Sequence, residues 1–194
     1  MEENKPIERK KLYEGYLTIE DYEGKEVIKH PNTIGAIIFD TTKEKYIFVE
    51  QTRAPAEGKT LEICAGKIDK GEETEEALKR EIIEETGYKV DNINHIYDYY
   101  TAIGYSTEIM SLFYVEVSEK LSDGGGIDGE DISLVEVDKL GFGGNLLFEG
   151  TEGEMIPPYR LVDAKSIMAV NYVEHNKIMK DTIDVLTSSK IREF

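Results

Sequence analysis

Three glutamates on one predicted helix are the residues of this chain best suited to chemistry. Glu81, Glu84 and Glu85 are spaced i, i+3 and i+4, and the segment Thr74 to Thr86 that carries them is rich in strong helix formers. On a helix this spacing places the three carboxylates on one face, with Cβ atoms about 5–6 Å apart. Carboxylates crowded in this way repel one another unless a cation lies among them. The spacing therefore predicts a cation site.

The chemistry of the ligands narrows the choice of cation. Carboxylate oxygens are hard ligands, which favour Mg²⁺ and also accept Mn²⁺. Zinc is a poor fit, because the sequence has a single cysteine, Cys64, and three histidines with no HExxH spacing. We expect Mg²⁺ as the cofactor, with Mn²⁺ possible. The alternative interpretation is a solvated, Glu-rich helix face that binds nothing.

A longer pattern surrounds the three glutamates. Gly66 is followed by five residues, Glu72, seven residues and then the run Arg80-Glu81-Ile82-Ile83-Glu84-Glu85-Thr86-Gly87-Tyr88. This segment resembles the Nudix box, and only its last position departs from the pattern, with Tyr88 in place of an aliphatic residue. The resemblance implies a Nudix hydrolase of the α+β class, an α/β/α sandwich with a mixed β-sheet and an N-terminal antiparallel β-hairpin extension.

The resemblance also implies roles within the box. Glu81 and Glu85 would be the metal ligands, with the carbonyl of Ala65 as a further ligand and Glu84 as an accessory one. Glu85 would thereby act directly in catalysis. The pair Glu72 and Arg80 is implied to fix the loop on the helix.

The similarity continues outside the box, toward the ADP-ribose and nucleotide-sugar pyrophosphatase branch of the family. By this resemblance Arg53 and Glu62 bind the nucleotide; the alternatives are a surface arginine and a paired strand carboxylate. The segment from Gly104 to Glu108 resembles the branch's Gly-x-x-x-Glu loop, so Glu108 would support substrate or metal binding. Tyr105, one of 12 tyrosines, is a candidate for stacking on a base.

A glycine-rich loop supplies the candidate general base. Residues 123–132 are similar to the catalytic loop of GDP-mannose and UDP-sugar hydrolases, and the glycines would allow the loop to close over substrate. Glu130 is the first choice for the base and for a further metal ligand, and Asp128 is the second. A calcium loop is the alternative, but the spacing fits neither an EF-hand nor an RTX repeat.

Two positions bear on the substrate. The run Cys64-Ala65-Gly66 resembles the GDP-mannose enzymes, whereas Ile103 stands where ADP-ribose enzymes typically have a proline. The resemblance thus favours a nucleoside diphosphate sugar of the GDP-mannose type over ADP-ribose.

Composition excludes several other classes of protein. The 194 residues include 23 Lys and Arg against 40 Asp and Glu, a formal net charge of −17. This charge disfavours nucleic acid and anionic membrane surfaces as partners. The sequence contains no apolar run of the roughly 18–20 residues that a membrane span requires. One cysteine fits a reducing compartment, so a cytoplasmic location is expected.

Patterning predicts two regions along the chain. Residues 1–31 form the N-terminal extension, with a β-hairpin over Leu12 to Ile28 that the resemblance associates with a homodimer. Residues 32–194 form the Nudix domain. Its predicted strands are 34–39, 46–50, 61–64, 94–100, 108–117 and 132–137, and its predicted helices are 74–86, 137–148 and 163–177.

Two functions of different classes are compatible with these features. The first is a metal-dependent hydrolase that cleaves the diphosphate of a nucleoside diphosphate sugar, giving a nucleoside monophosphate and a sugar phosphate. The second is a non-catalytic Nudix-like sensor of nucleotide sugars. The intact set Glu81, Glu84 and Glu85 favours the enzyme.

Overall fold

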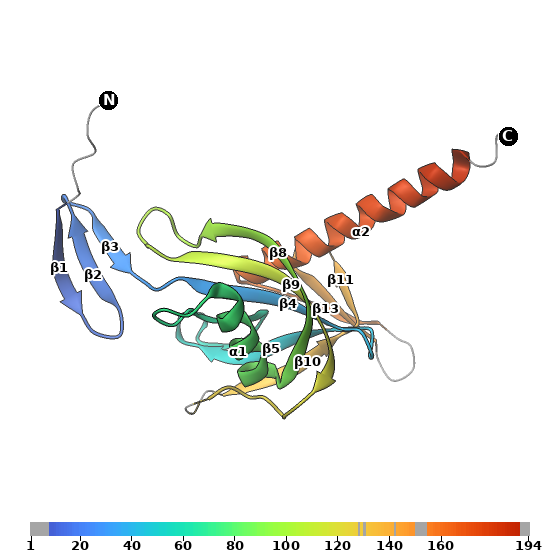
Figure 1. Cartoon of the computed structure of the whole chain (residues 1–194), viewed down its shortest axis with the longest axis horizontal. Coiled ribbons are helices and arrows are strands. Elements are labelled where there is room, and N and C mark those ends of the chain that lie inside the picture. The colour runs from blue at the N-terminus through green and yellow to red at the C-terminus, as the bar shows by residue number, and fades with distance from the viewer. Residues whose placement is uncertain (1–7, 128, 130, 142, 150–154, 191–194) are drawn as a thin grey trace.

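The fold is known from a computed structural model that describes residues 8–127, 129, 131–141, 143–149 and 155–190. A three-stranded antiparallel sheet stands at the N-terminal end, apart from the body of the molecule (Figure 1). It consists of β1 (Arg9–Glu14), β2 (Thr18–Tyr22) and β3 (Glu26–Lys29). The predicted antiparallel extension is therefore present, with one strand more than a simple hairpin.

A seven-stranded mixed sheet forms the body. Its members are β4 (Thr33–Asp40), β5 (Lys45–Arg53), β6 (Gly58–Glu62), β7 (Cys64–Lys67), β8 (Tyr88–Tyr100), β9 (Ile109–Lys120) and β10 (Ile132–Val137), with a short 3₁₀ turn at Ala54–Ala56. β4 is the central strand and pairs with β9 in parallel, while the other pairings are antiparallel. Along the opposite edge of β4, residues 33–36 pair with β7 and residues 38–40 pair with β5. The sheet therefore forks at Ile37.

Two helices cover the two faces of this sheet, α1 (Thr74–Thr86) and α2 (Ala164–Lys190). Side chains alternate along β4, because successive residues of a strand point to opposite faces. Ile34, Ala36 and Ile38 share a buried cluster with α1, whereas Ile37 shares one with α2. The predicted α+β sandwich with a mixed sheet is confirmed.

α1 has the bounds that the sequence predicts. Glu73 and Glu76 form a reciprocal capping box at its start, and Gly87, with a φ of 75°, closes its C-terminal end in the left-handed conformation. Ala77, Leu78 and Ile82 are buried against the sheet. The opposite face of the helix remains available for polar side chains.

One predicted helix, 137–148, is wrong. The segment instead forms β11 (Lys139–Gly141) and β12 (Asn145–Glu149), which pair with each other, and β12 pairs with β13 (Met155–Arg160). Gly143 and Gly144 have positive φ angles, which make a turn where a helix would have to continue.

The closing helix is longer than predicted, and ends at Lys190 rather than Lys177. Its first half packs on the sheet through Ala169 and Val170, and its second half projects away from the body (Figure 1). Among the described residues, no helix combines the length and the apolar character that a membrane span needs.

Candidate active site

A pocket of about 860 Å³ lies where the sheet forks. Five predicted site residues line it, and they come from three separate parts of the chain. They are Arg53, Ala65, Glu81, Glu85 and Glu108. The fold thus brings together the residues of the box and those that precede and follow it.

The first wall of the pocket is formed by α1 and β7. Glu85 is buried, with 5% of its surface exposed, and its Oε2 accepts a hydrogen bond from the backbone N–H of Ala65 at 3.3 Å. A Cβ atom on Gly66 would lie 1.9 Å from Cδ of Glu81. Only a glycine therefore allows the Glu81 carboxylate to lie against the β7 backbone.

A cation does lie among the crowded carboxylates, and in the described structure it is Arg80. Its guanidinium donates to Glu72 through Nε and Nη2, both at 2.9 Å, to Glu81 at 2.9 Å and to Glu84 at 3.1 Å. These hydrogen bonds, above all those to Glu72, raise the pKa of Arg80. The hydrogen bonds from Arg80 in turn lower the pKa of Glu72 to about 2.

The predicted pairing of Glu72 with Arg80 is therefore present. Arg80 also donates to the carbonyl of Lys67, and Glu72 accepts the backbone N–H of Asp69 at 3.0 Å. Both bonds tie the loop before α1 to the helix. Neither Glu84 nor Glu72 lines the pocket, although both accept hydrogen bonds from Arg80, which does.

The second wall of the pocket is formed by β5 and the start of α2. Arg53 donates two hydrogen bonds to Glu62, from Nε at 2.8 Å and from Nη2 at 2.9 Å. Lys165 contacts Oε2 of the same carboxylate, the oxygen that also accepts from Nη2 of Arg53, and donates to Asp163 at 2.9 Å. Thr60 donates to Glu62 at 2.6 Å. Burial alone would raise the pKa of Glu62, but these donors lower it to about 2.

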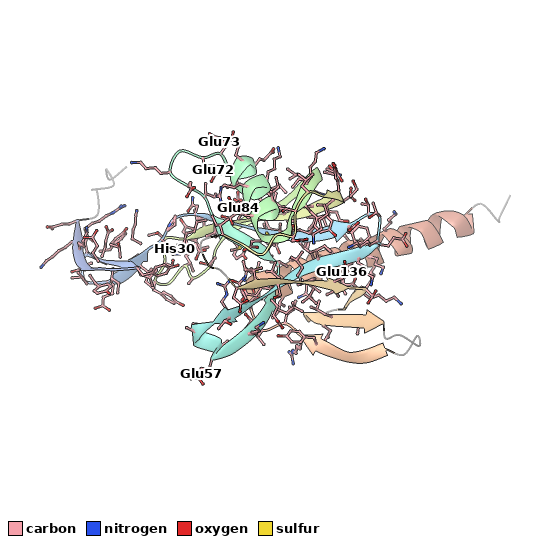
Figure 2. All side chains as sticks on the ribbon, turned by 90° about the horizontal axis from the view of Figure 1, so that it is seen from below. His30, Glu57, Glu72, Glu73, Glu84 and Glu136 are labelled. Carbon is pink, nitrogen blue, oxygen red and sulfur yellow. The ribbon has the colours of Figure 1, made fainter. Side chains whose placement is uncertain are left out.

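Glu108 belongs to a third group of polar residues at the pocket. Its carboxylate accepts hydrogen bonds from Thr33 and Thr101, each at 2.7 Å, and lies 3.8 Å from Nδ1 of His30. His30 sits between the N-terminal sheet and the body (Figure 2). Tyr105 does not line the pocket, and its backbone carbonyl accepts the N–H of Ile28.

Other predicted residues lie elsewhere. Glu62 is buried behind Arg53 and does not line the pocket itself. Glu130 and Asp128, the candidate bases, lie outside the described residues. Ile127, which precedes Asp128 in the sequence, lines the pocket. Cys64 is fully buried, and burial raises the pKa of its thiol.

Sequence reasoning missed Lys165, Asp163, Tyr16 and Tyr99, all of which line the pocket. Lys165 and Asp163 stand at the start of a predicted helix, and nothing local in the sequence marks them as site residues. Tyr16 lies in the turn between β1 and β2, with its ring 4.9 Å from Nζ of Lys67. Only the tertiary fold could bring these residues to the pocket.

The oxygen donors present fit a hard divalent cation. Glu81 and Glu85 both approach the Ala65–Gly66 backbone, so two carboxylates and a main-chain segment meet at one place on the pocket wall. Among the described residues, no three Asp, Glu, His or Cys side chains group closely enough to hold a metal by themselves.

Comparisons with known proteins agree with this geometry. The NUDIX domain matches residues 29–160. A methanol dehydrogenase activator of Bacillus methanolicus is 29% identical over 189 residues, which are 92% of this chain and 96% of that protein. An ADP-ribose pyrophosphatase of Bacillus subtilis (strain 168) is 32% identical over 89% of this chain and 93% of its own. A GDP-mannose pyrophosphatase of Salmonella arizonae is 31% identical over 80% of each chain.

The chain therefore belongs to the Nudix family. It is a Nudix pyrophosphatase, a hydrolase of phosphorus-containing acid anhydrides. The predicted branch is also confirmed, since relatives named for ADP-ribose and for GDP-mannose match at similar identity.

Proposed function

We propose that the protein hydrolyses the diphosphate of a nucleoside diphosphate sugar of the GDP-mannose or ADP-ribose type, with Mg²⁺ as its cofactor and Mn²⁺ as a possible substitute. The products are a nucleoside monophosphate and a sugar phosphate. The observation that carries the proposal is the opposite charge of the two pocket walls, with carboxylates Glu81 and Glu85 on one and cations Arg53 and Lys165 on the other.

A diphosphate needs both kinds of wall. Glu81, Glu85 and the carbonyl of Ala65 would hold the metal, which when bound polarises phosphoryl oxygens and lowers the pKa of a coordinated water. Arg53 and Lys165 would bind the diphosphate oxygens from the other side, and the planar fork of Arg53 suits such oxygens. Tyr16 and Tyr99 offer aromatic surfaces at the pocket for the base or sugar.

The remaining roles, which are proton transfer, support of the metal and further substrate binding, are given to the residues predicted from the sequence. Glu130 would accept the proton of the attacking water, with Asp128 as the second choice, and Glu84 would support the metal from outside. Glu62 would act in substrate binding through Arg53 and Lys165, which it holds in place. Glu108 would bind substrate from the far side of the pocket, and Tyr105 would stack on a base only if its loop moved toward the pocket.

Turnover of ADP-ribose, GDP-mannose and UDP-glucose, assayed separately with Mg²⁺, tests the proposal. We expect hydrolysis of at least one of them, its loss in EDTA and its return with added Mg²⁺. The variant Glu85→Gln should lower turnover about 100-fold or more and still bind substrate, because loss of groups that only support a metal ligand already costs about 10–100-fold.

Glu75→Gln is the matched control. Glu75 lies on the same helix, is exposed, and pairs only with Lys79 among the described residues, so this variant should match the wild type. Binding of a nucleotide sugar without turnover by the wild type would instead support the sensor. No turnover and no binding of any of the three compounds would refute both functions.

We also propose that the protein is a cytoplasmic homodimer that pairs through the N-terminal extension, residues 1–31. All six residues of β1 are exposed, and they include the apolar side chains of Leu12 and Tyr13. An exposed edge strand of this kind can pair with another chain. Light scattering should give twice the mass of the chain, and a monomer at micromolar concentration would contradict the dimer.

A further inference from the structure

The chain changes its neighbouring strand at Ile63. β6 pairs with β5 up to Glu62, and β7 pairs with β4 from Cys64, so Ile63 belongs to neither ladder. Ile63 is fully buried. Because a buried backbone N–H without an acceptor is costly, this position needs a partner from outside the sheet.

Ser166 is that partner. Its Oγ accepts the N–H of Ile63 at 2.9 Å, from a position 103 residues further along the chain. Ser166 is fully buried in the first turn of α2, where the carboxylate of Asp163 accepts its backbone N–H at 3.1 Å. The preceding residue, Lys165, contacts Glu62. Two consecutive residues of α2 thus hold two consecutive residues at the crossing between strands.

The crossing lies directly before the part of β7 that contacts Glu81 and Glu85. These two carboxylates belong to the pocket wall formed by α1 and β7, which we call the acidic wall. Ala65 follows Ile63 by two residues, and its N–H donates to Glu85. Gly66 comes next and lies against the carboxylate of Glu81. A shift at Ile63 therefore moves the backbone that both carboxylates contact. Cys64, between Ile63 and Ala65, is fully buried too, so close packing leaves no free space to absorb the shift.

We propose that Ser166 is a positioning residue for this wall: by fixing Ile63, it sets the place of Ala65 and Gly66 relative to Glu85 and Glu81. Ser166 itself does not line the pocket. It lies on α2, which covers the face of the sheet opposite to α1 and its carboxylates. Its effect on metal binding rests on the proposed function, whereas its effect on the backbone does not.

The experiment compares Ser166→Ala with Val170→Ala. Both residues are fully buried in α2, but Val170 packs through an apolar side chain in the same core cluster as Ile63 and offers the Ile63 N–H no acceptor. Val170→Ala thus controls for a general loss of stability. Two quantities are measured in the full chain: hydrogen exchange of the Ile63 and Ala65 amides by NMR, and Mn²⁺ affinity by calorimetry without substrate.

We expect Ser166→Ala to speed exchange of both amides roughly tenfold relative to Val170→Ala, since the lost acceptor leaves a buried donor unsatisfied. The Kd for Mn²⁺ should rise several-fold in Ser166→Ala alone. Unchanged exchange at Ala65 would overturn the proposal, even with a change at Ile63, because Ser166 would then have only a local structural role.

An unchanged Kd for Mn²⁺ in Ser166→Ala would likewise overturn it. If the wild type binds no Mn²⁺, the metal part of the proposed function fails instead. Exchange at Ala65 still decides the role of Ser166 in that case, so the two failures are distinguishable.

Discussion

The two walls of the pocket are built from the same kinds of residue in different proportions. On the α1 wall one cation, Arg80, is shared by three acids, Glu72, Glu81 and Glu84. On the other wall two cations, Arg53 and Lys165, share Glu62, and Lys165 also pairs with Asp163. The first wall therefore keeps surplus negative charge, whereas the second balances its charges and presents the cations Arg53 and Lys165 to the pocket, as a metal-bound diphosphate between the walls would require.

The proportions also decide which residue of each wall is hard to replace. Loss of one acid from the α1 wall leaves Arg80 with two other partners. Loss of Glu62 leaves Arg53 with no carboxylate partner among the described residues. The shared residue, Arg80 on one wall and Glu62 on the other, holds each wall together.

The largest effect is expected from Gly66→Ala, which breaks the α1 wall alone. The new Cβ would displace the Glu81 carboxylate, so turnover and Mg²⁺ affinity should both fall about 100-fold. Gly58→Ala is the control, since its Cβ would meet only the carbonyl of Ala56 at 3.9 Å. Steady-state kinetics and calorimetry measure the two effects. Wild-type kinetics in Gly66→Ala would show that Glu81 need not rest on the backbone.

The next largest effect is expected on stability, where the variants Glu62→Gln and Glu72→Gln compare the two walls directly. Glu62→Gln should lower the free energy of unfolding by about 3 kcal/mol, because it leaves Arg53 without a carboxylate partner among the described residues and Lys165 with Asp163 alone. Glu72→Gln should lower it by less, because Arg80 keeps Glu81 and Glu84. Urea denaturation of both variants checks the order, and equal losses would contradict the argument from shared partners.

A smaller effect is expected from acid. The pKa of Glu62 is lowered to about 2 in the folded protein, so its stabilisation is complete above its unfolded pKa of about 4.5 and is lost as pH falls toward 2. The difference in unfolding free energy between the wild type and Glu62→Gln should hence be constant above about pH 5 and shrink below it. Urea titrations between pH 7 and pH 3 measure this difference. A difference that grows on acidification would mean that Glu62 is protonated at neutral pH.

The smallest effect is expected from Arg53→Lys. The charge remains, but lysine cannot form the two parallel hydrogen bonds that Arg53 makes with Glu62. The KM should rise a few-fold while kcat changes little, if Arg53 binds ground state and transition state alike. Lys59→Arg, at an exposed position of β6 paired with Glu50, should leave both constants unchanged. A large fall in kcat would place Arg53 in the chemical step instead.

The acidic wall could be predicted from sequence because its residues are close together in the chain. Glu81 and Glu85 lie on one helix, and the helical period alone puts them on one face. The loop pair of Glu72 with Arg80 is local as well. The cation wall could be predicted only in part: Arg53 and Glu62 lie on consecutive strands, nine residues apart in the chain, but Lys165 joins them from 103 residues beyond Glu62.

The failed helix has a similar cause. Residues 137–148 contain leucines whose spacing can be taken for a helical stripe, and the pairing of Leu140 with Leu146 becomes evident only in the folded sheet. β13, which completes this sheet, is a strand that local patterning did not predict. Pairing between consecutive strands decided the structure there, and the propensities of single residues do not contain it.

The fork at Ile37 has a consequence for how the protein folds. β4 is the common partner of β5, β7 and β9, and β9 is made much later in the chain than β4. Contacts so distant in sequence form slowly, since a long loop must close before they stabilise anything. A chain emerging from the ribosome can complete α1, with all its glutamates, well before β9 and α2 exist. The acidic wall is therefore expected to form early. The pocket is complete only after β9 and α2 have been added.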